Sequence, residues 1–139
     1  MKTTIKLSKV INAFSANDKG KSIIIHVFDS IKNFKRKVAL KNHYKEVKET
    51  YELFIKERQG LIDSLLNPWL EKTNKDAKKK LSIEDFPVLP PVLMPKFTIA
   101  INKLIETEVD FKPFKFTEKE IEESGITISE MVLIEDFYG

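Results

Sequence analysis

The sequence predicts an α+β fold that is predominantly helical, with one long helix and a small sheet of two or three strands. Apolar residues recur every three or four positions over about 22–66, the period of a helix with one buried face. β-prone residues alternate with others near both ends of the chain, at 3–7 and around 109–116. The length of 139 residues, with 42% hydrophobic and 32% charged residues, is typical of a single domain spanning 1–139.

The first elements are predicted from local signals. Residues 3–7 indicate a short strand, and Ser8 is placed to cap a helix from Lys9 to about Ala16. Residues 17–20 (Asn-Asp-Lys-Gly) favour a turn, because Asn, Asp and Gly tolerate the left-handed backbone of a tight reversal.

The long helix is predicted to follow Ser22, a residue type that favours the N-cap position. The segment is expected to be one long helix, or two nearly collinear helices with an adjustment near 38–40. It should end at Asn67-Pro68, because proline pushes the preceding residue out of the α region. The predicted buried stripe comprises Ile23, Ile24, Val27, Phe28, Ile31, Phe34 and Val38, followed by Leu40, Tyr44, Val47, Tyr51, Phe54, Leu61 and Leu65.

Residues 67–96 are predicted to form a flexible or extended segment. Within it, Phe86–Pro95 carries four prolines among apolar residues, a composition typical of a polyproline-like strap. Because an apolar strap does not stay in water, it is expected to lie on the protein's own core or on another chain, and these alternatives weigh equally. The possible partner-binding residues of this segment are Trp69, Val92, Leu93 and Met94.

The last third of the chain is predicted to alternate short elements. A helix from Phe97 to about Thr107 precedes a strand over 109–116, which we expect to pair with 3–7 in antiparallel order. Thr117 and Glu120 match a capping box, so a helix should begin at Glu118 and end at Gly125. A last short helix is predicted from Ser129.

Charge is distributed unevenly along the chain. Residues 1–80 hold 19 basic and 9 acidic residues, whereas residues 81–139 hold 5 and 12, giving nets of +10 and −7. Such asymmetry indicates a charged partner or two surfaces of one fold that meet. The candidate face for phosphates or an acidic partner comprises Lys32, Lys35, Arg36, Lys37, Lys41, Lys45 and Lys48.

Two interpretations of this basic face were open from the residues alone. Its lysines fall at helical steps beside Tyr44 and Tyr51, so they could track phosphates while the tyrosines stack on bases. Alternatively, the lysines lie on a solvated helix face and pair with Glu49 and Glu52 four residues away.

The residues that chemistry usually requires are sparse in this sequence. There is no cysteine, the four glycines leave no phosphate-binding loop, and neither His26 nor His43 lies in a cluster of metal ligands. No apolar stretch approaches the ~20 residues that span a bilayer. We therefore expect no enzymatic activity, no cofactor, no metal and no membrane association.

Several segments, taken in order, resemble a group of small uncharacterised proteins from tailed bacteriophages. The matching segments are Ile5–Ser8, Asn17–Ser22, Leu104–Phe111, Gly125–Ser129 and Leu133–Phe137. The resemblance implies a phage protein that works by binding, located in the host cytoplasm or the virion.

Three functions are therefore expected, in order of preference. The first is a virion assembly component or adaptor that acts by contact with other protein chains, copies of itself included. The second is a nucleic-acid-binding accessory protein that uses the basic face of residues 32–48. The third is a small inhibitor of a host enzyme or defence factor, with the acidic C-terminal part as a decoy surface.

Overall fold

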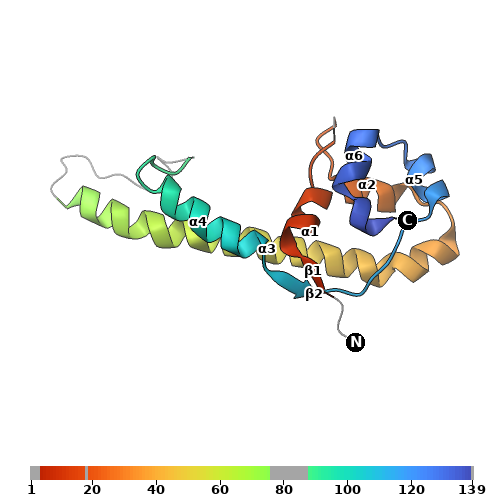
Figure 1. Cartoon of the computed structure of the whole chain (residues 1–139), viewed down its shortest axis with the longest axis horizontal. Coiled ribbons are helices and arrows are strands. Elements are labelled where there is room, and N and C mark those ends of the chain that lie inside the picture. Colours follow the sequence, from red (N-terminus) through yellow and green to blue (C-terminus); the bar gives the residue numbers. More distant parts are fainter. Residues whose placement is uncertain (1–3, 18, 76–87, 139) are drawn as a thin grey trace. The chain divides into compact units, whose positions relative to one another are not determined.

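The computed structural model describes residues 4–17, 19–75 and 88–138, and it confirms the predominantly helical α+β class. Its elements follow one another as Figure 1 shows. They are β1 (Thr4–Lys6), α1 (Leu7–Ala13), α2 (Ile23–Ser30), α3 (Phe34–Asn74), α4 (Met94–Ile105), β2 (Glu108–Asp110), α5 (Glu118–Ser124), α6 (Ile128–Leu133) and the 3-10 helix η2 (Glu135–Phe137).

The chain forms two compact units. Unit 1 consists of residues 1–52 and 105–139, and unit 2 consists of the intervening residues 53–104. Helix α3 contributes its first half to unit 1 and its second half to unit 2. Each unit is described below by itself.

The predicted pairing between the two ends of the chain is confirmed in unit 1. Strands β1 and β2 are antiparallel, with Ile5 opposite Val109. The strand predicted over 109–116 is shorter than expected, and Phe116 instead forms an isolated parallel bridge with Tyr138.

Helix α1 begins at Leu7, so the predicted start at Lys9 with Ser8 as the cap was wrong. Its N-cap residue is Lys6, which makes no side-chain capping bond. Leu7, Val10 and Ala13 are buried on one side of the helix. Burial of this stripe outweighs the weaker local preference of Ser8 for the cap position.

The single helix predicted over 22–66 is interrupted, and this is the main correction to the predicted fold. Helix α2 ends at Ser30, Ile31 is extended, and α3 begins at Phe34. The side chain of Asn33 accepts a hydrogen bond from the backbone N–H of Arg36 at 3.0 Å, which satisfies one of the unpaired donors at the start of a helix. The adjustment expected at 38–40 is therefore wrong, since that stretch lies inside α3.

Helix α3 also passes through Pro68, where the sequence predicted an end. Pro68 is exposed, whereas Leu66 and Leu70 on either side of it are buried in one apolar cluster. Packing of these two leucines keeps the helix intact although Pro68 has no backbone N–H to donate a helical hydrogen bond.

The flexible or extended segment predicted over 67–96 is wrong at its two ends, which are helical. Residues 67–74 belong to α3, residues 91–93 form a turn, and Met94–Pro95 open α4 with the proline in the first turn. Part of the predicted strap, residues 86–87, lies outside the described residues.

The short C-terminal helices follow their capping signals closely. Thr117 and Glu120 form the predicted capping box of α5, and Gly125 ends it with a φ of 71°. A second capping box between Thr127 and Glu130 opens α6, so the predicted start at Ser129 was wrong. Local side-chain chemistry is sufficient to set these boundaries.

The core of unit 1 is rich in aromatic residues. Phe28 contacts Phe114 and Phe116, with ring centroids 5.6 and 4.9 Å apart, and Phe137 lies 5.5 Å from Phe114. Buried aliphatic residues surround these rings: Leu7, Val10, Ile23, Ile24, Val27, Ile31, Leu40, Val47, Ile121 and Ile134.

The predicted stripe is partly correct. Its buried residues are Ile23, Ile24, Val27, Phe28, Ile31, Leu40, Val47 and Phe54. Phe34 and Val38 are exposed, and Leu61 and Leu65 are half-buried. Tyr44 and Tyr51 are only half-buried.

Candidate interaction surface

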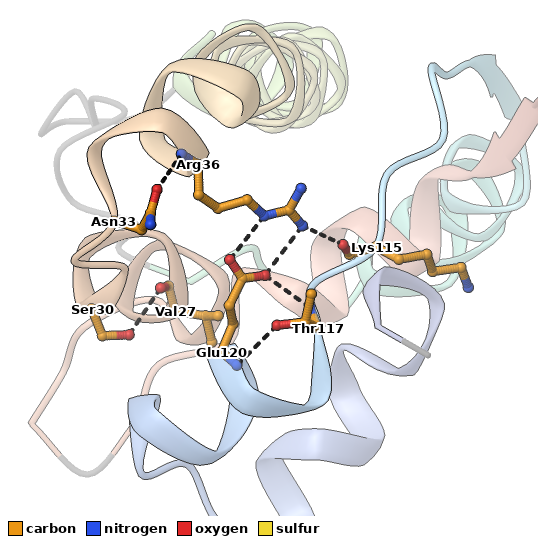
Figure 2. A network of polar contacts seen from close by, with 7 residues as sticks. All are labelled: Val27, Ser30, Asn33, Arg36, Lys115, Thr117 and Glu120. Atoms are coloured by element: carbon orange, nitrogen blue, oxygen red, sulfur yellow. Dashed lines mark hydrogen bonds and ion pairs between the residues drawn. The ribbon is translucent and has the colours of Figure 1, made fainter.

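A polar network joins the start of α3 to the start of α5 in unit 1, as Figure 2 shows. The guanidinium of Arg36 donates to the Glu120 carboxylate through Nε at 2.8 Å and Nη2 at 3.1 Å. Nη2 also donates to the backbone carbonyl of Lys115 at 2.7 Å. Thr117 completes the network, because its backbone N–H donates to the Glu120 carboxylate at 2.8 Å.

This network removes Arg36 from the predicted basic face. Burial raises the pKa of Glu120, but the hydrogen bonds and positive charge of Arg36, together with the bonds from Thr117, outweigh it and hold that pKa below its usual value. Arg36 was predicted to meet a partner. It instead neutralises an acid of its own chain that lies 84 residues away.

The lysines of the basic face are all exposed. Among the described residues, Lys32, Lys35, Lys37, Lys41 and Lys45 form no ion pair, and Lys48 approaches the Tyr44 ring at 6.0 Å. The ion pairs expected between these lysines and Glu49 or Glu52 are not formed among the described residues. These six lysines are therefore without an ion-paired acid in the part of the chain that the structure describes.

Two large apolar side chains lie among these lysines, and the sequence prediction had placed both in the core. Phe34 is 77% exposed and Val38 is 56% exposed. They lie one turn apart on α3, whose opposite side buries Leu40 and Val47. The three-and-four spacing continues through the break at 31–33, so periodicity alone could not reveal the change of face. Asn33 was the available signal, because asparagine favours the N-cap position.

The tyrosines proposed to stack on bases are engaged within unit 1. The ring of Tyr51 stacks on Phe14 with centroids 4.2 Å apart, and the rings of Phe28 and Tyr44 form a T-shaped pair with centroids 5.2 Å apart. Tyrosines packed in this way contribute to the core and leave Phe34 as the exposed aromatic of the basic face.

A shallow groove lies between α2 and the first turns of α3, with a volume of about 220 Å³. Apolar side chains form its floor and charged ones form its rim. Its lining residues are Phe28, Asp29, Ile31, Lys37, Leu40, Lys41 and Tyr44. The groove thus lies beside two of the unpaired lysines.

The other predicted binding residues lie in unit 2 and separate into two groups. Leu93 is buried with Leu66 and Leu70, and Trp69 packs against this cluster. Val92 is 66% exposed and Met94 is 38% exposed. Trp69 and Leu93 therefore pack together in the apolar cluster of unit 2, whereas Val92 and Met94 are exposed to solvent.

Both histidines have structural contacts. The Nε2 atom of His26 lies 2.8 Å from the carbonyl oxygen of Ser124, and the His43 ring packs 4.8 Å from that of Phe114. Within the described residues, no group of three or more histidine or acidic side chains is placed to hold a metal ion. The same part of the chain contains no helix long and apolar enough to cross a membrane.

No known protein family, curated protein or solved structure matches the chain.

Proposed function

We propose that this protein is a non-enzymatic binding protein that acts by contact with another protein chain. The observation that supports this most strongly is the solvent-facing side of the first turns of α3, the α3 contact face. It is formed by Phe34, Lys37, Val38, Lys41 and Lys45. In the phage setting that the resemblance implies, such a protein would be a virion assembly component or an adaptor.

The α3 contact face combines two properties that are unfavourable for an isolated surface. Leaving a side chain such as Phe34 in water forgoes about 1.5–3 kcal/mol of hydrophobic stabilisation. Lysines that lack acidic partners repel one another at short range. A partner that covers the apolar pair and offers negative charge relieves both costs at once.

A protein partner fits this face better than nucleic acid does. Tyr44 and Tyr51, the proposed stacking residues, are occupied by Phe28 and Phe14. Glu49 and Glu52 follow one turn after the last lysines of the stripe and interrupt its positive charge. Phosphate contacts depend on positive charge, which these two acids reduce, whereas exposed aromatic and aliphatic side chains such as Phe34 and Val38 are typical of the apolar centre of a protein interface.

The test is affinity purification of the tagged protein from the cells that naturally contain it. Phe34→Ser with Val38→Ser should lose the co-purifying protein while leaving the melting temperature nearly unchanged. Ile128→Ser is the matched control, because Ile128 is 81% exposed on α6 and lies outside the α3 contact face. Retention of the partner by the double variant, or recovery of nucleic acid alone, would refute the proposed function.

A further inference from the structure

The groove between α2 and α3 has the size of a single-residue site. Its volume of about 220 Å³ lies below the ~300–1,000 Å³ of pockets that enclose small-molecule ligands. Phe28, Ile31 and Leu40, which line it, are buried residues of the unit 1 core. A core-supported apolar floor of this size suits one large apolar side chain presented by a partner.

The charges around the groove favour a negatively charged occupant. Lys37 and Lys41 are exposed on its rim and form no ion pair among the described residues. Asp29, the acid of the groove lining, forms an ion pair with Lys21, so its charge is already compensated. The two lysines are one turn apart, about 6 Å along the helix axis, so the carboxylates of neighbouring residues in one peptide can contact both.

The groove continues into the rest of the α3 contact face. Phe34 precedes Lys37 by three residues and Val38 precedes Lys41 by three, so each apolar side chain neighbours one of the two lysines on the helix surface. The two lysines therefore lie with apolar surface on either side: the groove on one, and Phe34 with Val38 on the other. A segment bound across this face would contact the apolar groove first, then the two lysines, and then the apolar side chains of Phe34 and Val38.

Unit 1 itself shows how this fold accommodates a segment of matching chemistry. At its C-terminal end, Ile134 and Phe137 are fully buried, while the carboxylates of Glu135 and Asp136 each lie 3.9 Å from Lys9 Nζ. Apolar side chains are enclosed and the acids between them face a lysine. Because Ile134 and Phe137 are fixed inside their own unit, this segment cannot be offered to a second copy without unfolding it.

We propose that the groove binds an acidic segment of a different protein, which inserts one large apolar side chain and places carboxylates on Lys37 and Lys41. This inference rests on the proposed function and specifies the chemistry of its partner. Charge complementarity selects the acidic segment, and groove volume limits the anchor to one side chain.

The probe is a fluorescently labelled synthetic peptide, Leu-Ile-Glu-Asp-Phe-Tyr, titrated with the full-length protein and followed by fluorescence anisotropy. Lys37→Glu with Lys41→Glu should weaken binding about tenfold or more, because two surface charge contacts are reversed. Lys32→Glu with Lys35→Glu is the matched control. It changes the net charge equally at exposed lysines outside the groove, and it should alter affinity by less than about twofold.

Each of the following results would overturn the inference. Equal weakening of peptide binding by both double-lysine variants would show only general charge attraction. Equal binding of a second peptide, in which Gln-Asn replaces Glu-Asp, would show that the carboxylates are not required. Displacement of the peptide by a single-stranded oligonucleotide at lower concentration would assign the face to nucleic acid. An increase in solution mass with protein concentration that is lost in the groove variant would place a second copy there. If the peptide does not bind but Phe34→Ser still abolishes capture of the partner, the groove proposal is wrong and the proposed function is retained.

Discussion

The two units differ in how much of their apolar surface they bury. Unit 1 packs a network of aromatic rings with aliphatic residues from both ends of the chain, and the Arg36–Glu120 pair joins two of its elements. The apolar cluster of unit 2 is centred on Leu66, Leu70 and Leu93. Aromatic rings and aliphatic residues therefore build the core of unit 1, whereas three buried leucines form the apolar cluster of unit 2. The difference indicates that core disruption should spread through unit 1 but stay local in unit 2.

The largest expected effect is in the aromatic core of unit 1. Phe116 is completely buried and contacts Phe28 and Phe114, so Phe116→Ala should lower the free energy of unfolding by about 3–5 kcal/mol. Chemical denaturation followed by far-UV circular dichroism measures this change. A loss below about 1 kcal/mol would show that the rings do not form a tightly packed core.

A slightly smaller effect is expected in unit 2. Leu66 is 1% exposed, and Leu66→Ala should cost about 2–5 kcal/mol of stability. Hydrogen exchange resolved by residue should then show loss of protection in α4 and little change in α5. Equal loss of protection in both helices would show that the two units unfold as one, which would break the comparison.

The ion pair of unit 1 should contribute less than its aromatic rings. Glu120→Gln keeps a capping side chain but removes the charge that Arg36 contacts, so a loss of about 1.5–3 kcal/mol is expected near neutral pH. The lowered pKa of Glu120 gives the sign of the pH dependence. Its stabilisation is present above the ordinary glutamate pKa and disappears as the pH falls through the lowered value. Melting curves of the two proteins should converge in acid, and a constant difference would contradict the assignment.

The smallest effect is expected at the exposed residues of unit 2. Val92→Ser should change stability by no more than about 0.5 kcal/mol, whereas Leu93→Ser next to it should be clearly destabilising. Thermal unfolding of the two single variants provides the comparison. Similar losses at both positions would mean that Val92 is covered in solution.

The parts of the fold that were predicted from the sequence are those that depend on neighbouring residues. Thr117 with Glu120 and the left-handed Gly125 define α5 through short-range hydrogen bonds. The pairing of the first strand with the region of Val109 was also predicted from the sequence, because few β-prone segments were available to pair.

The remaining boundaries depend on tertiary packing and could not be predicted locally. The helical period continues across 31–33, so the extended Ile31 and the change of face at Phe34 leave no mark in the spacing. Pro68 carries a strong local bias against helix, and the burial of Leu66 and Leu70 overrides it. For the candidate surface, the lysines were predicted correctly as exposed, but Phe34 and Val38 were assigned to the core.

The insertion of unit 2 between the two parts of unit 1 has a consequence for the order of folding during synthesis. Residues 53–104 are contiguous and leave the ribosome before β2, whereas β1 must wait about 100 residues for its partner strand. Closing an unstructured loop of that length costs about 4 kcal/mol of chain entropy. Any helix that forms early within the inserted segment shortens the flexible loop that remains to be closed, which lowers the entropy cost of pairing β1 with β2.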